Sequence, residues 1–66
     1  MDPLYHYDID TLIRCVQREV RMRESLYPEL VAEGSMTPDE ATIEIDMMVR
    51  VAERLIQVRN QKVTSL

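Results

Sequence analysis

Apolar residues recur every three or four positions in two long segments of this chain, the spacing that gathers side chains on one side of an α-helix. The first segment ends near Glu33, and the second runs from Pro38 to roughly Gln57–Gln61. The first stripe consists of Ile9, Leu12, Ile13, Val16, Val20, Tyr27, Leu30 and Val31. The second stripe consists of Ala41, Ile45, Met48, Val49, Ala52, Leu55 and Ile56. The pattern predicts two amphipathic helices that share one core.

The residues between the two segments carry dense stop and start signals. Gly34 follows the first periodic run, and a glycine just past a helix end adopts the left-handed conformation that closes the last turn. Thr37, Pro38 and Glu40 form a typical helix start: a capping hydroxyl, a proline at the first helical position and a glutamate that completes a capping box. We therefore expect a tight turn between antiparallel helices.

The pattern divides the chain into three parts. Residues 1–8 form an N-terminal arm, residues 9–60 form the helical hairpin, and residues 61–66 form a C-terminal tail that is expected to fray. Asp8 and Asp10 are both suitable N-caps for the first helix, and the pattern leaves the choice between them open.

Pro28 lies inside the first predicted helix. It removes one backbone hydrogen bond and crowds the carbonyl of Glu24, so the helix should bend or restart there. A bend is the favoured outcome. The predicted fold class is thus all-α, an antiparallel two-helix hairpin with a kinked first helix.

The turn also determines which positions face each other across the hairpin. Folding at residues 34–37 brings Val16 level with Leu55, so that the two apolar stripes match. Arg23 lies in the first stripe and comes within one turn of Glu44. We expect these two side chains to form an ion pair between the helices.

A second set of apolar residues lies outside both stripes, and we call them the outer residues. They are Cys15, Met22 and Leu26 on the first helix and Ile43, Met47, Val51 and Val58 on the second. A two-helix hairpin buries one face of each helix, so the outer residues should form an exposed patch, which on a soluble protein usually marks an interface. The favoured interpretation is a homodimer that forms a four-helix bundle, or a higher oligomer. The alternative is a surface for a foreign protein, with methionines as adaptable contacts.

Composition narrows the class of protein. The chain has 66 residues, a net charge of −4 and a single cysteine, so it cannot form an internal disulfide bond and a structural zinc site is not expected. No apolar run approaches the length of about 20 residues that spans a bilayer. The start of the chain does not resemble a secretory signal. We expect a cytoplasmic protein without cofactor or metal.

Two clusters could bind a ligand. Arg14, Arg18 and Arg21, here called the arginine stripe, lie together on the solvent side of the first helix and could hold phosphate, although such stripes are usually solvated or paired with acids. The arm carries Tyr5, His6 and Tyr7. These side chains could stack on a base or enter a partner's pocket, although they more often cover the end of their own bundle.

The sequence contains no arrangement typical of catalysis. His6 has no nucleophile or carboxylate that the sequence places beside it, and Cys15 is expected to be a half-buried small hydrophobe. A helix–turn–helix reading is disfavoured because acids crowd the start of the second helix and would repel DNA phosphate. These acids are Asp39, Glu40, Glu44 and Asp46. We expect neither enzymatic activity nor DNA binding.

The central part of the chain resembles a pattern in small uncharacterised proteins of bacteriophages and prophages. The pattern consists of Met22-Arg23, Tyr27-Pro28, Val31, Gly34, Met36-Thr37, Glu40-Ala41, Glu44-Ile45 and Met48. The resemblance implies a phage-related context and no particular site. Small phage accessory proteins commonly bind a host component, such as a transcription, signalling or antiviral-defence protein.

Two functions follow as expectations. The first is a non-catalytic phage-type accessory protein that self-associates and binds a host protein in the host cytoplasm, for host takeover or defence evasion. The second is a helical oligomer that binds or sequesters a nucleotide or nucleic acid, with tyrosines stacking on bases and the arginine stripe holding phosphates.

Overall fold

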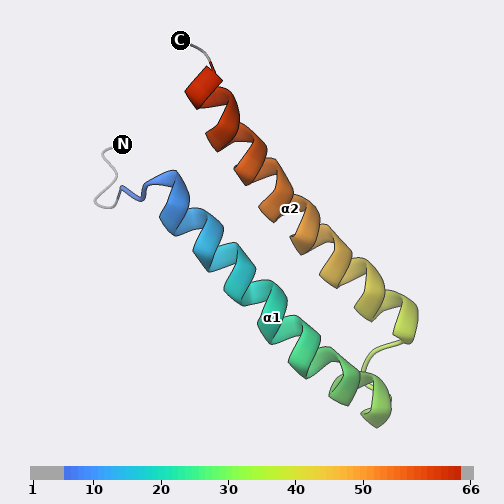
Figure 1. Cartoon of the computed structure of the whole chain (residues 1–66). Helices are drawn as coiled ribbons and strands as arrows, with labels where there is room; N and C mark the ends of the chain where they lie inside the picture. Colours follow the sequence, from blue (N-terminus) through green and yellow to red (C-terminus); the bar gives the residue numbers. More distant parts are fainter. Residues whose placement is uncertain (1–5, 65–66) are drawn as a thin grey trace, which may run out of the picture.

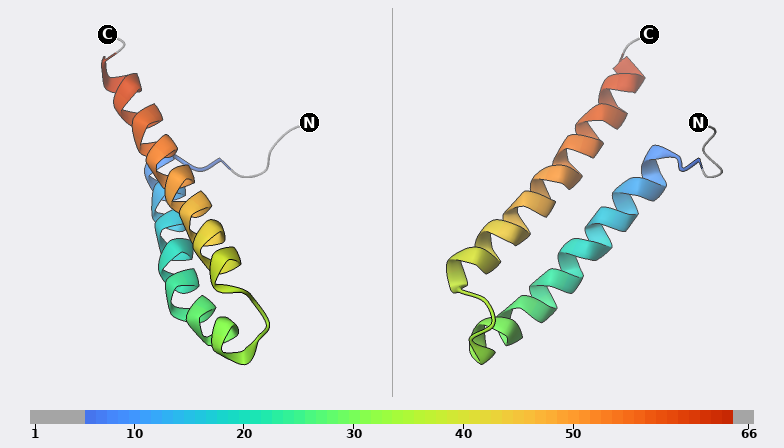
Figure 2. Two further views of the ribbon diagram at one scale, coloured as in Figure 1. Left: turned by 90° about the vertical axis from the view of Figure 1, so that its right-hand side faces the viewer. Right: turned by 180° about the vertical axis from the view of Figure 1, so that it is seen from behind.

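The chain folds as two antiparallel helices in a computed structural model that describes residues 6–64. Helix α1 comprises Ile9–Glu33 and helix α2 comprises Pro38–Thr64, and the described residues contain no strand. The helices lie side by side in opposite directions, with the turn at one end and both chain ends at the other (Figures 1 and 2). The predicted all-α, antiparallel two-helix hairpin is therefore confirmed.

Both helix starts have the predicted capping chemistry. Asp8, rather than Asp10, is the N-cap of α1, and its carboxylate accepts a hydrogen bond of 2.8 Å from the backbone N–H of Thr11. At α2 the amide of Glu40 donates to the hydroxyl of Thr37 at 3.0 Å, and the amide of Thr37 donates to the Glu40 carboxylate at 2.9 Å. This reciprocal pair is the capping box that the sequence predicts.

The end of α1 is closed by Gly34, which has a positive φ of 83°. Its amide donates to the carbonyl of Val31 at 3.0 Å, and the amide of Ser35 donates to the carbonyl of Leu30 at 2.9 Å. These two bonds are those of a Schellman motif, which satisfies carbonyls that a helix end leaves without partners.

Helix α1 continues without interruption through Pro28 and ends at Glu33, so the restart, which the sequence did not favour, does not occur.

The end of helix α2 differs from the sequence expectation. Helix α2 continues to Thr64, past Gln61 and into the segment predicted to fray. No glycine or proline follows Gln61. Because glutamine and lysine are good helix formers, nothing in this part of the sequence ends the helix earlier.

The core between the helices is small. Of the described residues, only Ile13, Ala41 and Ala52 are buried, with exposed fractions of 4%, 8% and 8%. The other stripe residues are half-buried, apart from Leu12, which is 39% exposed. The prediction of Leu12 as a core residue was wrong, because it lies at the edge of the stripe, far from the turn where the helices are joined.

Replacement of Gly34 tests the turn. We expect Gly34→Ala to lower the free energy of unfolding by about 1 kcal/mol, because alanine adopts positive φ at a cost. Nothing lies within 4 Å of the position that a Cβ would take, so the loss comes from the backbone alone. Gly34→Asn is the control and should lose less, since asparagine tolerates this conformation. Urea unfolding at one protein concentration measures both variants, and equal losses would contradict the argument.

Candidate functional site

All seven outer residues are exposed, as the sequence predicts. Cys15 is exposed as a free thiol rather than half-buried, so that part of the prediction was wrong. The exposed fractions of the other six range from 43% for Val51 to 58% for Met22. With Leu12 they form one set, which we call the apolar face. It consists of Leu12, Cys15, Met22, Leu26, Ile43, Met47, Val51 and Val58.

These residues lie on one side of the hairpin. On each helix they occupy the same flank of the core stripe, at about 100° per residue, while Gln17, Arg21 and Glu53 occupy the other flank. An open groove of about 400 Å³ runs between the helices and is lined by Gln17 and Arg21 from α1 and Glu53 from α2. Because the polar flanks of the two helices meet at this groove, their apolar flanks meet on the opposite side of the hairpin.

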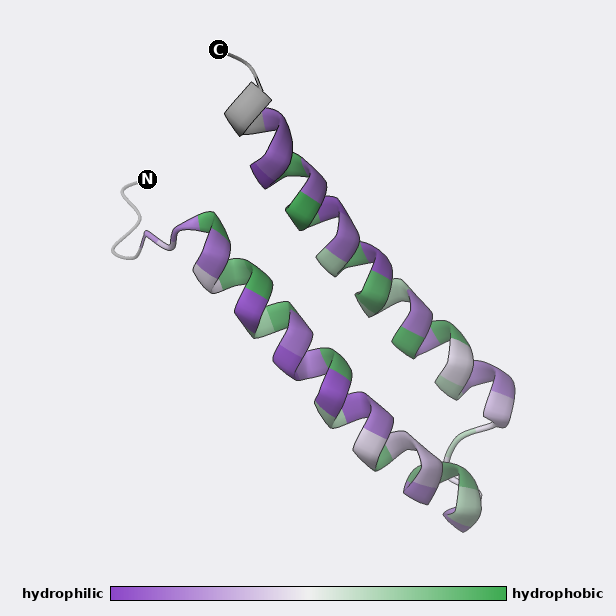
Figure 3. Ribbon diagram, in the orientation of Figure 1, coloured by the Kyte–Doolittle hydropathy of each residue, from purple (hydrophilic) through white to green (hydrophobic). Residues whose placement is uncertain are grey.

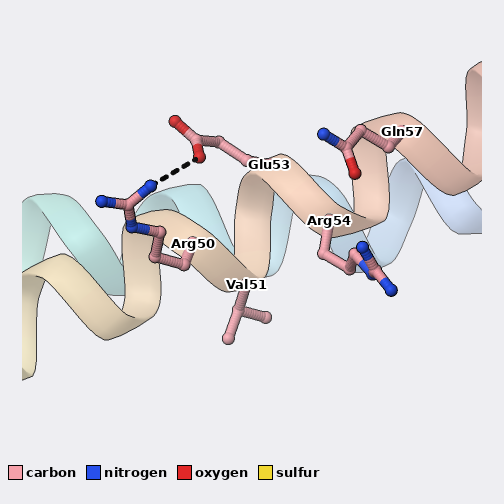
Figure 4. Close-up of a pocket in the computed structure, with 5 residues that line it drawn as sticks. All are labelled: Arg50, Val51, Glu53, Arg54 and Gln57. Atoms are coloured by element: carbon pink, nitrogen blue, oxygen red, sulfur yellow. Dashed lines mark ion pairs between the residues drawn. The ribbon is translucent and has the colours of Figure 1, made fainter.

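In the middle of α2, the apolar side and the polar side of the hairpin can be seen directly. In Figure 4, Val51 and Arg54 extend to one side of the helix, and Glu53 and Gln57 extend to the other. Hydrophobic positions also recur along the whole length of both helices, rather than gathering at one end (Figure 3). The apolar face is therefore long, with Val51 near its middle on α2.

Arg23 joins the two helices on the apolar side. Its Nε donates to the Glu19 carboxylate at 3.0 Å, and its Nη1 donates to the backbone carbonyl of Glu44 at 2.9 Å and to the Glu44 carboxylate at 3.4 Å. Its guanidinium also lies over the ring of Tyr27, 5.7 Å from the centroid. The predicted ion pair between Arg23 and Glu44 is confirmed, and it includes a bond to the backbone that the sequence does not indicate.

Two groups among the described residues have shifted pKa values. The hydrogen bond with Glu19 is the largest effect that raises the pKa of Arg23, so this side chain stays charged. Hydrogen bonds with Thr11 lower the pKa of Asp8 below its ordinary value of 3.8. A lowered pKa favours the folded state above the ordinary pKa, and this contribution is lost as the pH falls through the folded value. The N-cap of α1 is therefore weakened by strong acid.

The arginine stripe is exposed along its whole length, as predicted. Arg14 and Arg18 line an open hollow of about 370 Å³ together with Tyr7, which is 61% exposed. Arg21 does not reach this hollow and lines the interhelical groove instead. The structure thus brings one arm residue and two arginines together and separates the third arginine from them.

The rest of the arm offers less. His6 is exposed, and Tyr5 lies outside the described residues. The sequence does not predict the position of Tyr7 beside α1. The arm has no periodic pattern of apolar residues, so nothing in it indicates which side of the helix it lies against.

A metal site and a membrane-spanning helix have no support within residues 6–64. No group of three His, Cys, Asp or Glu side chains in this part of the chain could hold a metal ion. Neither helix is long and apolar enough to cross a membrane, as far as it is described. No protein-family model, curated protein or solved structure matches the chain. The apolar face is therefore the candidate functional site.

Replacement of Arg23 tests the link between the helices. We expect Arg23→Ala to lower the melting temperature more than Arg50→Ala, because Arg23 joins both helices and its side chain is only 21% exposed. Arg50 pairs with Asp46 and Glu53 inside α2, and its side chain is 71% exposed. Thermal unfolding followed by circular dichroism at one concentration compares the two. Equal shifts would show that the contacts across the hairpin do not stabilise it.

Proposed function

We propose that this chain is a non-catalytic interaction protein that self-associates through its apolar face and acts by binding another protein. The observation that supports this function is the placement of the eight exposed apolar side chains on one side of the hairpin. The opposite groove is lined by charged and amide side chains as well as core residues. Such asymmetry is typical of a helical subunit whose core is completed by a partner.

Self-association would cover this face without requiring a different protein. Two hairpins stacked on their apolar faces form a four-helix bundle, which adds side chains of both copies to a core that contains three buried residues among those described. A homodimer is the simplest such assembly, and a higher oligomer would use the same face.

The partner beyond the second copy is proposed to be a host protein. This part of the proposal derives from the resemblance to small phage proteins, which act in the cytoplasm of the host by binding its components. In the self-associated form a host protein would contact the exposed arm around Tyr7, while the Met47 and Val51 part of the apolar face would bind a host protein only in place of the second copy. Methionine suits such a role because its flexible side chain adapts to different surfaces.

Charges introduced on the apolar face test self-association. We expect the double variant Met22→Glu, Met47→Glu to weaken self-association at least roughly tenfold, since each assembled interface would bury unpaired carboxylates. The control is Gln17→Glu, Gln57→Glu, which adds the same charge at exposed positions on the polar flank. Light scattering over a range of micromolar concentrations measures the mass, and circular dichroism checks that both variants stay helical.

The same measurement can contradict the proposal. A wild-type chain that stays monomeric at these concentrations, and that captures no protein from a host lysate in affinity purification with mass spectrometry, would exclude both parts of the function. A control variant as weak as the apolar-face variant would show that added charge, rather than the face, causes the loss.

A second candidate function is the binding of a nucleotide or nucleic acid. The observation that favours it is the hollow lined by Tyr7, Arg14 and Arg18, which combines an aromatic ring with two cations. If it binds nucleotides, millimolar ATP or GTP should raise the melting temperature, and Arg14→Ala with Arg18→Ala should abolish the rise. An unchanged melting temperature across nucleotides and short oligonucleotides would exclude this function.

A further inference from the structure

The hollow between the arm and α1, which we call the arm hollow, combines three kinds of side chain. It lies beside the first turns of α1, at the end of the hairpin where both chain ends lie (Figure 1), and its volume is about 370 Å³. The residues that line it are Tyr7, Thr11, Leu12, Arg14, Cys15 and Arg18. They provide an aromatic ring, two cations and an apolar edge. Such a set suits a ligand that has both a flat ring and a negative charge.

The two arginines of the arm hollow are held beside it by their own helix. Nη2 of Arg14 donates to the hydroxyl of Thr11 at 3.3 Å, and Nη2 of Arg18 donates to the sulfur of Cys15 at 3.9 Å. Each acceptor lies three residues before its arginine and lines the hollow. A guanidinium group has five N–H donors, so each arginine keeps donors for a ligand.

The charges of Arg14 and Arg18 are not neutralised by an ion pair within residues 6–64. The first half of α1 and its cap contain three acids, and each has another partner. They are Asp8, which accepts from the amide of Thr11 at 2.8 Å, Asp10, which pairs with Arg59 at 2.8 Å, and Glu19, which pairs with Arg23 at 3.0 Å. The local acids therefore leave both arginines available to an anion.

Two arginines match the charge of one phosphate monoester. Such a group carries a charge of about −1.5 to −2 at neutral pH, and its three free oxygens accept hydrogen bonds. The Cα atoms of Arg14 and Arg18 lie about 6 Å apart along the helix axis, so the long side chains can bind the same phosphoryl group. The hydroxyl of Thr11 accepts from Arg14 and still has its own proton to donate.

Tyr7 provides the flat surface beside these donors. Its side chain is 61% exposed, and Leu12 and Cys15 border the same hollow. A nucleobase stacks on an aromatic ring through its π-face, which every base has, so the contact does not select one base. The ring and the arginines together accommodate a base at one side and a phosphate at the other.

The cations do not continue as a track for a longer strand. Arg21, the third residue of the arginine stripe, lines the groove between the helices instead. Beyond Arg18, the outer side of α1 presents an apolar, a neutral and an acidic side chain, those of Met22, Ser25 and Glu29. Proteins that bind single strands use a positively charged groove that follows the backbone. The arm hollow therefore suits one nucleotide better than a strand.

We propose that the arm hollow binds a nucleoside monophosphate, with its base stacked on Tyr7 and its phosphate held by Arg14 and Arg18. This inference rests on the second candidate function, the binding of a nucleotide or nucleic acid, and narrows it to a single nucleotide. It is independent of the host protein proposed as a partner.

Calorimetric titration of the full chain tests the ligand. AMP should bind at least roughly tenfold more tightly than adenosine or inorganic phosphate, because each of these two probes has only half of the contacts. GMP, CMP and UMP should bind within about threefold of AMP, since stacking tolerates all bases. The titration is repeated on Met47→Glu, so that a second copy on the apolar face does not hide the hollow.

Variants at the hollow test the contacts. Tyr7→Leu and Arg18→Gln should each weaken AMP binding at least roughly fivefold, since one removes the ring and the other a cation. Tyr7→Phe keeps the ring and should stay within about twofold of the wild type. Arg21→Gln is the matched control for Arg18→Gln, because it removes an exposed cation of the same stripe outside the hollow. Circular dichroism checks that all four variants stay helical.

The possible results separate this inference from the function on which it rests. If no nucleotide or oligonucleotide binds at concentrations up to about 5 mM, both are excluded. If inorganic phosphate binds as tightly as AMP, or if Arg21→Gln loses as much as Arg18→Gln, the assignment to the hollow is overturned. If a strand of eight thymidines binds more than roughly tenfold more tightly than thymidine monophosphate, the limit to one nucleotide is overturned and nucleic-acid binding remains.

Discussion

The structure depends on one geometric constraint: two helices packed against each other cover only one side of each. In this hairpin the covered side contains three buried residues among those described, and two of them are alanines. Hydrophobic burial of this size leaves little stability after the conformational entropy of ordering the chain is subtracted. The polar contacts that join the helices, above all those of Arg23, add to the core but do not replace a missing layer. In the proposed self-association, a second copy covers these apolar side chains and so adds to the stability of the molecule.

The turn decides which side chains remain uncovered. Gly34 ends α1 and the capping box of Thr37 and Glu40 begins α2, so the register between the helices follows from local hydrogen bonds. A shift of one residue in either helix would rotate its face by about 100° and divide the apolar face between two sides of the hairpin. A few residues at the turn therefore determine the position of the apolar face.

Much of this fold follows from the sequence because its signals are local. Caps, the glycine at the helix end and the apolar period each act within a few residues, and the contact between Arg23 and Glu44 follows once the register is known. One error, the burial of Leu12, concerns a feature that depends on distance along the hairpin. Leu12 and Leu30 are five turns apart and so point in the same direction, yet Leu30 is half-buried and Leu12 is exposed. Periodicity describes direction around a helix and says nothing about how closely the other helix approaches at each level.

The short turn also has a consequence for the rate of assembly. Residues 34–37 connect α1 and α2, and the contacts between the helices form when α2 folds back against α1. Closing so short a loop takes well under a microsecond. A helical hairpin of low contact order forms quickly. In the proposed bundle the slow step would then be the encounter of two chains, so the half-time of assembly should shorten as the protein concentration rises. The rate at which the hairpin itself forms should not depend on the protein concentration.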